Sequence, residues 1–145
     1  MDIQLHEKYK KVLFPRDSEL MDMYIEILEQ DAAMMKVFRY IGKQQSQAGT
    51  AQESGLTIND LIENIQVDRL VKKQKNSRNF KYEQALTNLH RKTAERIIDK
   101  LNVMSLIYYK SVKPYKFIFL TERGKQLLVR IIELKTKQKE MNMNG

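Results

Sequence analysis

The segment from Leu89 to Leu120, LHRKTAERIIDKLNVMSLIYYKSVKPYKFIFL, decides the fold of this chain of 145 residues. Its first half places apolar side chains at positions i, i+3, i+4 and i+7, which predicts one buried helix face: Ala94, Ile97, Ile98 and Leu101. The opposite face carries a basic residue every four positions, at Lys92, Arg96 and Lys100. Like charges at this spacing repel by about 0.2–0.5 kcal/mol per pair, so an anion lying along the helix would stabilise it.

Two strand-like segments follow this helix. Leu106–Tyr109 and Tyr115–Leu120 are rich in aromatic and β-branched residues, and Lys110–Pro114 lies between them as a basic tip. A basic helix that leads into a two-stranded ribbon with a basic tip is typical of a winged helix. We therefore expect a mainly α (α+β) protein: a winged helix-turn-helix with a two-stranded wing and flanking N- and C-terminal helices.

Composition favours one intracellular domain over residues 1–145. Hydrophobic residues make up 42% of the chain, enough for an ordinary core. No run of about 18 apolar residues predicts a membrane span, and the N-terminus lacks a signal-peptide pattern, so we expect a cytoplasmic protein. The absence of cysteine excludes disulfides and Cys-based zinc sites, and His6 and His90 lie too far apart to suggest a metal pair. We expect neither metal nor cofactor.

The net charge of +8 is unevenly distributed along the chain. Residues 66–116 carry 13 Lys/Arg against 4 Asp/Glu, whereas residues 1–65 carry 7 against 11. A basic block that covers the helix and ribbon described above favours a polyanionic partner. The alternative is a solvated basic face without a ligand.

Residues 1–43 are expected to form an N-terminal lead and helix. Residues 1–16 predict an irregular or short strand-like lead, and Asp17 or Ser18 can cap the following helix. The apolar-rich segment from Glu19 to about Lys43 predicts one long helix, or two joined near Gln30–Asp31.

The segments that follow predict a loop, a capped helix and the final helix. Gln44–Gly55 is small and polar, which indicates a loop. Thr57–Asp60 fits a capping-box variant, and the helix that it opens is expected to continue through Leu70 and Val71. Beyond the ribbon, Thr121 can cap a last helix that runs from Glu122 to about Lys137.

The segment between these helices is harder to assign. Lys72–Lys81 is basic and polar and predicts a loop or a helix end, and Tyr82–Leu101 looks helical throughout. The helix-turn-helix break is expected between Thr87 and Arg91, where Asn88 can adopt the left-handed conformation.

The order of these segments resembles that of MarR-type winged-helix regulators and their PadR-like relatives, over roughly residues 30–135. The resemblance is carried by TINDLIENI (Thr57–Ile65), RKTAERIIDKL (Arg91–Leu101), LIYYKSVKPYKFIFL (Leu106–Leu120) and LTERGKQLL (Leu120–Leu128). Two features depart from the family: 25 residues separate Ile65 from Arg91, and the wing tip is short and lacks the usual acidic-arginine sequence.

The resemblance implies a helix-turn-helix and wing over residues 57–120. It also implies a homodimer held by the N- and C-terminal helices, the latter over residues 121–138. The apolar stripe of that helix consists of Leu127, Leu128, Ile131 and Leu134.

The predicted DNA contacts lie on the helix and on the ribbon. Arg96 would contact guanine edges or phosphate from the major groove, and the helix as a whole supplies Arg91, Lys92, Thr93, Arg96 and Lys100. The wing would reach a minor groove or flanking phosphates through Lys110, Lys113 and Lys116. The alternatives are an exposed amphipathic helix and a solubilising hairpin whose lysines protect a strand edge.

A third basic group is either a set of backbone contacts or a charged loop: Lys72, Lys73, Lys75, Arg78 and Lys81. The aromatic residues of the ribbon are expected to pack in its core rather than to stack on bases. His90 is expected to be a surface or capping histidine. The chain has no nucleophile elbow, phosphate-binding glycine loop or zinc-ligand set, so we expect no enzyme.

The favoured hypothesis is a sequence-specific double-stranded-DNA-binding protein, a homodimeric bacterial transcriptional regulator. A plasmid or phage DNA-maintenance factor for replication or partition is one alternative. The other is a protein-interaction adaptor, in which a winged helix is a scaffold for Met-rich helices. Regulation by a small-molecule effector rests on analogy alone.

Overall fold

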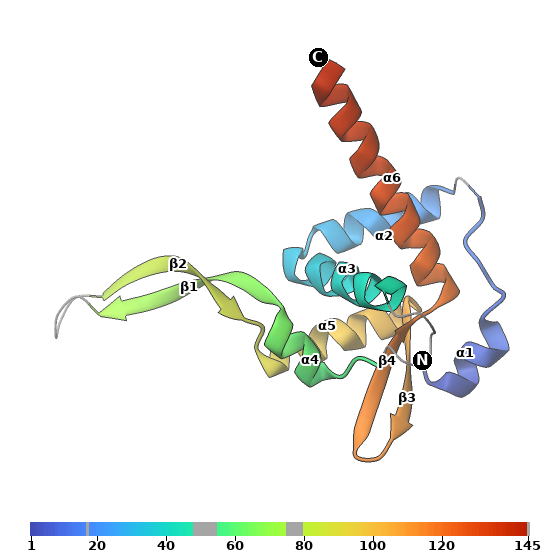
Figure 1. The fold of residues 1–145 in the computed structure, drawn as a ribbon, viewed down its shortest axis with the longest axis horizontal. Helices are drawn as coiled ribbons and strands as arrows, with labels where there is room; N and C mark the ends of the chain where they lie inside the picture. Colours follow the sequence, from blue (N-terminus) through green and yellow to red (C-terminus); the bar gives the residue numbers. More distant parts are fainter. Residues whose placement is uncertain (17, 48–54, 75–79, 145) are drawn as a thin grey trace.

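The computed structural model describes residues 1–16, 18–47, 55–74 and 80–144, which form six helices and two separate antiparallel sheets of two strands. The fold is therefore mixed α+β (Figure 1). In chain order the elements are α1 (Ile3–Tyr9), α2 (Glu19–Glu29), α3 (Ala32–Gln47), α4 (Ile58–Asn64), β1 (Gln66–Gln74), β2 (Phe80–Asn88), α5 (Arg91–Val103), β3 (Ile107–Val112), β4 (Tyr115–Leu120) and α6 (Glu122–Asn144).

The prediction of an irregular or strand-like N-terminal lead was wrong for residues 3–9, which form α1. Asp2 begins this helix because its Oδ1 accepts a hydrogen bond from the backbone N–H of Leu5 at 2.9 Å. His6 is the only buried residue of α1, and its ring stacks on Tyr108 with the centroids 3.7 Å apart. One stacked histidine leaves no apolar stripe in the sequence, which is why the helix was missed.

The segment from Glu19 onward adopts the second of the two predicted alternatives, two helices joined near Gln30–Asp31. Ser18 caps α2 by accepting a hydrogen bond from the N–H of Met21 at 3.3 Å. Asp31 does the same for α3, where its Oδ1 accepts from the N–H of Met34 at 3.1 Å. Asp17, the other predicted cap, lies outside the described residues.

The capping box at Thr57 and Asp60 is confirmed, because each side chain accepts a hydrogen bond from the other residue's backbone N–H. The predicted length of that helix was wrong, since α4 ends at Asn64 and β1 begins two residues later. The predicted start of the preceding loop at Gln44 was also wrong, because α3 continues to Gln47; residues 48–54 lie outside the described part of the chain.

The largest correction concerns residues 66–74 and 80–88, which form the two paired strands of a β-hairpin where a helix, a helix end or a loop was predicted; residues 75–79 lie outside the described part of the chain. The register runs from Gln66 opposite Asn88 to Gln74 opposite Phe80. α5 begins at Arg91, inside the predicted break, although Asn88 is not left-handed: among the described non-glycine residues only Ser105 has a positive φ. Apolar residues in β1 fall at helix-like spacings, so no clear alternation marked a strand.

The second hairpin was predicted well. β4 has the predicted bounds, while β3 starts one residue later than expected and continues to Val112, so the tip shrinks to Lys113 and Pro114. An isolated antiparallel bridge joins Leu56 to Ile118 of β4, and the N–H of Ile118 donates to the Leu56 carbonyl at 2.8 Å.

α6 begins as predicted and ends later. The Oγ1 of Thr121 accepts a hydrogen bond from the N–H of Gly124 at 3.0 Å, which caps the helix. A Cβ at Gly124 would lie 2.3 Å from the Leu106 carbonyl oxygen, so only glycine permits this approach to the residue before β3. The helix continues past Lys137 to Asn144, and its second half projects away from the body (Figure 1).

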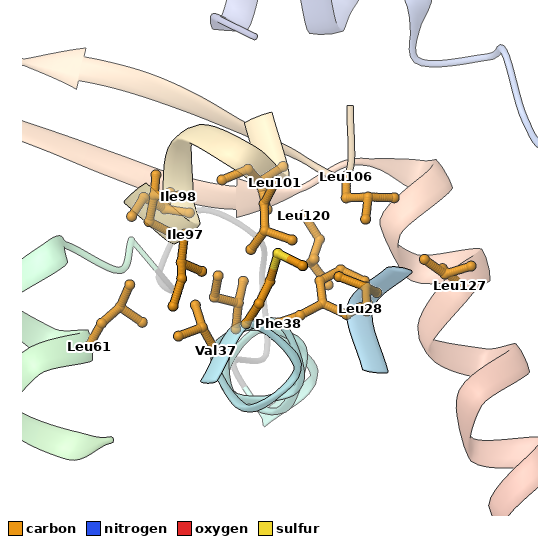
Figure 2. Packing of buried hydrophobic residues seen from close by; sticks show 14 of the residues in the cluster. Leu28, Val37, Phe38, Leu61, Ile97, Ile98, Leu101, Leu106, Leu120 and Leu127 are labelled. Carbon is orange, nitrogen blue, oxygen red and sulfur yellow. The ribbon is translucent and has the colours of Figure 1, made fainter. Parts of the chain in front are cut away.

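One hydrophobic cluster connects these elements and excludes most of β1 and β2. Figure 2 shows Phe38 and Val37 of α3 facing Ile97 and Leu101 of α5, with Leu120 of β4 close by. These side chains are buried almost completely, which provides the main stabilisation of the body. The apolar face of α5 thus packs on α3 in the core, and the opposite side of α5 is exposed to solvent.

Candidate nucleic-acid interface

α5 separates its apolar and charged residues as the sequence predicts. Its buried residues are those of the expected face: Ala94, Ile97, Ile98 and Leu101. Among the residues predicted to contact DNA, Thr93 is half-buried and the others are exposed: Arg91, Lys92, Arg96 and Lys100. The four basic side chains are therefore accessible to a ligand, although they do not form a single cluster.

Arg96 is held by an acidic residue of a different helix. Its Nη1 lies 3.4 Å from Oδ2 of Asp31, the residue that caps α3, and the two side chains are 48% and 24% exposed. An ion pair at such exposure contributes little to stability and exchanges readily. Arg96 is thus positioned at the junction of α2 and α3 and can release Asp31 for another anion.

The N-terminal end of α5 is attached to its neighbours by two arginines. The guanidinium of Arg91 donates to Oδ1 of Asn59 in α4, and that of Arg69 in β1 contacts Nε2 of His90. His90 occupies the N-cap position, but its side chain makes no capping hydrogen bond to the first turn. His90 is therefore an exposed surface histidine, one of the two predicted alternatives, and its side chain does not cap the helix. Sequence analysis missed the contacts of Arg69 and Asn59, because their partners are more than 20 residues away.

Lys100 lies away from this end of the helix. Lys100 lies nine positions after Arg91, which corresponds to roughly 13 Å along the helix axis. It lines an open groove of about 860 Å³ between α2, α3 and α5, together with Ile27, Asp99 and Val103. The basic surface of α5 is therefore concentrated in its first half, and its second half borders an apolar groove.

The predicted wing residues Lys110, Lys113 and Lys116 are all exposed on β3, β4 and their turn. The ammonium group of Lys116 lies 3.8 Å from the centroid of the Tyr109 ring, an attractive cation–π arrangement. The three lysines lie at or near the tip of a hairpin that points away from the core (Figure 1).

The aromatic residues at the base of this hairpin pack within the chain. Tyr108 stacks on His6 and also on Phe119, whose ring centroid is 5.3 Å away. Burial raises the pKa of Tyr108 and lowers the pKa of His6 from its ordinary value of 6.5. These two rings hold the N-terminal segment against β3 and are not available for base stacking.

The third basic group lies on the hairpin of β1 and β2. Lys72, Lys73 and Lys81 are exposed, and Lys73 forms an ion pair of 3.0 Å with Glu83 on the neighbouring strand. Lys75 and Arg78 lie outside the described residues. The hairpin projects from the base of α5, so its lysines extend the basic surface away from the body (Figure 1).

The stripe predicted to hold a dimer is largely used inside the single chain. Leu127 and Ile131 are buried in the core, and Leu128 and Leu134 pack against it. Dimerisation through this stripe stays a prediction. The apolar side chains that α6 exposes are different ones: Val129, Ile132 and Met141.

None of the described helices combines the length and the apolar character that a membrane span requires. Comparisons with protein-family models, with curated proteins and with solved structures found no match. The resemblance to MarR and PadR regulators therefore stays a prediction.

Proposed function

We propose that this chain is a winged-helix protein that binds double-stranded DNA sequence-specifically and acts as a homodimeric transcriptional regulator. In this proposal α4 and α5 correspond to the two helices of a helix-turn-helix, and β3 with β4 forms the wing. The isolated bridge between Leu56 and Ile118 joins the segment before α4 to strand β4 of the wing. The β1–β2 hairpin takes the place of the short turn between the two helices.

The observation that carries the proposal is the first half of α5. A helix whose one face is buried in the core presents Arg91, Lys92 and Arg96 on the accessible surface, next to a hairpin with an exposed basic tip. Arginine can bind guanine with two hydrogen bonds, and lysine neutralises phosphate. Base readout would come from α5, while the lysines of the wing and of β1–β2 would add contacts to the phosphate backbone.

The ion pair of Arg96 suggests how the free and bound states differ. In the free protein Asp31 holds the guanidinium beside α3, 3.4 Å away. A phosphate or a guanine edge would replace Asp31, because both accept hydrogen bonds from a guanidinium. Free Arg96 is thereby kept close to the position in which it would act.

A protein-interaction adaptor is the second candidate, and one surface favours it. α2 exposes Leu20, Met23 and Ile27 along one side, and Ile27 leads into the groove that Val103 lines. An exposed apolar strip of this kind is typical of a protein contact. Under this reading α5 and the wing are scaffold, and removal of their charges would leave partner binding intact.

Fluorescence anisotropy of a labelled duplex, titrated with protein at several salt concentrations, tests the proposal. With about five or more phosphate contacts, log affinity is expected to fall with log salt at a slope of roughly −4.5 or steeper. Selection from random duplexes then shows whether the protein prefers particular sequences.

The double variant Lys92→Ala/Arg96→Ala should weaken binding by about tenfold or more and reduce the magnitude of the salt slope by about one for each phosphate that is no longer neutralised. The matched control is Lys135→Ala/Lys137→Ala, which removes the same charge from exposed positions of the projecting part of α6. Equally weakened binding in both variants would indicate a nonspecific charge effect. Absence of binding by the native protein at low salt would contradict DNA binding and favour the adaptor.

A further inference from the structure

The two faces of the β1–β2 hairpin differ in how they are covered. Side chains alternate across a strand, so the register places one set of residues on each face. We call one of them the open face. It consists of Gln66, Asp68, Leu70, Lys72, Tyr82, Gln84, Leu86 and Asn88, and every one of these residues is exposed.

The apolar side chains of the opposite face are partly buried by the rest of the chain. Near the body, Val67 packs against the core, and Arg69 contacts His90. Farther out, the ion pair of Lys73 and Glu83 lies beside Val71, which is only partly exposed. Long charged side chains can cover apolar surface in this way while their charged ends stay in water.

The apolar side chains of the open face are far more accessible. Leu70, Tyr82 and Leu86 are 67%, 64% and 60% exposed. Leu70 on β1 is the diagonal neighbour of both Tyr82 and Leu86 on β2. Diagonal neighbours in a hairpin are close enough for large side chains to touch, so the three form one continuous patch. An isolated two-stranded hairpin is only marginally stable in water, which makes an exposed apolar patch here a site for a partner.

The chemistry of the open face is symmetric about its middle row. Leu70 pairs with Gln84 in that row; the row nearer the body pairs Asp68 with Leu86, and the row farther out pairs Lys72 with Tyr82. Along β1 an acid and a base thus flank a leucine at equal distances. Along β2 two apolar residues flank a glutamine.

We propose that two copies of this chain pair through the open face, with the hairpins stacked face to face, their strands antiparallel, and a two-fold axis at the row of Leu70 and Gln84. Such an axis places β1 over β1 and β2 over β2 in opposite directions. Leu70 then meets Leu70 of the second copy and Gln84 meets Gln84. Asp68 meets Lys72 of the second copy, and Leu86 meets Tyr82.

Each of these contacts joins groups that attract or bury one another. Leucine packs on leucine, two glutamine amides can exchange hydrogen bonds, and each carboxylate faces an ammonium group. A two-fold interface has to be self-complementary in this manner, because the same surface serves both copies. A face that carries one acid and one base has little attraction for a polyanion, so DNA does not fit it equally well.

The pairing leaves α5, the β3–β4 wing and the lysines of the opposite face, Lys73 and Lys81, free for DNA, and it uses only Lys72 of the proposed phosphate contacts. The hairpin projects away from α5 and from the β3–β4 wing (Figure 1). In the proposed dimer the outer part of each hairpin lies over the inner part of the other, which keeps the two bodies apart. Eight residue steps separate the two Gln66 positions across the axis, which is roughly 26 Å at the usual rise of a strand. The inference does not depend on DNA binding and can be tested without DNA.

Cysteine cross-linking tests the register directly, because the native chain contains no cysteine. Leu70→Cys and Gln84→Cys should each form cross-linked dimers of the full chain with a short bis-maleimide reagent. Val71→Cys, on the opposite face, is the matched control and should remain monomeric on a denaturing gel. Leu86→Cys and Tyr82→Cys should cross-link to each other when the two variants are mixed, and much less when each is alone.

A charge exchange measured by sedimentation provides the second readout. The native chain is expected to sediment as a dimer, Asp68→Lys and Lys72→Asp each as a monomer, and the double exchange Asp68→Lys/Lys72→Asp as a dimer again. Circular dichroism checks that each variant is folded. A native monomer, equal cross-linking from both faces, or a dimer that survives both single exchanges but disappears on deletion of residues 135–145 would overturn the proposal.

Discussion

The two hairpins of this chain differ both in composition and in surroundings. β3 and β4 are short and enter the core through Ile107, Ile118 and Leu120, all buried. β1 and β2 are longer, yet Val67 is their main contact with the core. Hairpin length therefore does not decide stability here. What differs is the apolar surface that each hairpin buries against a third element.

The surroundings also differ in how many segments support each hairpin. Leu56 bridges to β4 on one side, and on the other side the N–H of Tyr109 donates to the Met1 carbonyl at 3.0 Å. For β1–β2 the supports near the body are contacts of Arg69 and Lys36, the latter donating to the Gln66 carbonyl at 3.0 Å. We expect β3–β4 to open only with global unfolding and β1–β2 to open locally.

The largest expected effect is a difference in the free energy of unfolding between two variants, each with one side chain truncated in one of the hairpins. Ile118→Ala should lower the free energy of unfolding by about 2–5 kcal/mol because it leaves a cavity in the core, whereas Leu86→Ala should change it by less than about 0.5 kcal/mol. Urea denaturation at low protein concentration, where pairing between copies does not contribute, measures both. Comparable decreases would show that β1–β2 is buried in solution and would contradict the comparison.

A smaller effect is expected from the segment that covers β3. The Nη1 of buried Arg123 donates to the carbonyl oxygens of Tyr9 and Val12 at 3.0 and 2.6 Å. Arg123→Met leaves these acceptors without their donor, at a cost of about 1–3 kcal/mol. Hydrogen exchange should accelerate in residues 1–14 and in β3.

Hydrogen exchange in β1–β2 should be unchanged in Arg123→Met, because the hydrogen bonds of Arg123 go to the segment that covers β3. Lys125→Met is the matched control, because Lys125 lies on the same helix but is exposed and pairs with Glu122 at 3.3 Å. Faster exchange in both hairpins would instead indicate general destabilisation of the fold.

The smallest expected effect is a pH dependence of the free energy of unfolding that arises from His6, whose ring stacks on Tyr108 of β3. Burial, more than the nearby charge of Arg123, lowers the pKa of folded His6 below its ordinary value of 6.5. The unfolded chain therefore binds more protons between the two pKa values, so stability should fall as the pH drops from 7 through 6.5. His6→Phe keeps a ring against Tyr108 and should remove this part of the slope.

The control for this titration is His90→Gln, which removes the other histidine of the chain. If His90→Gln and not His6→Phe flattens the profile, the assignment of the slope to the buried ring is wrong.

Much of the body could be predicted from local patterns. The buried face of α5, the capping box at Thr57, the possible break near Asp31 and strands β3 and β4 all depend on residues close together in sequence. Where a segment packs against the core, its apolar residues recur with the period of a helix or a strand, and this periodicity can be recognised in the sequence. For the same reason the exposed basic residues of α5 could be named before the structure was known.

The β1–β2 hairpin and the contacts around it could not be predicted, because no core selects their residues. With one face covered by charged side chains and the other exposed, the strands show no alternation, and Leu70 and Val71 look like a continuing helix. The ion pair of Arg96 with Asp31 joins residues 65 apart in the chain. Local sequence determined helices α2 to α6 and strands β3 and β4. Only the tertiary structure decided how a basic residue is partnered and which hairpin face stays open, because both depend on segments brought together by folding.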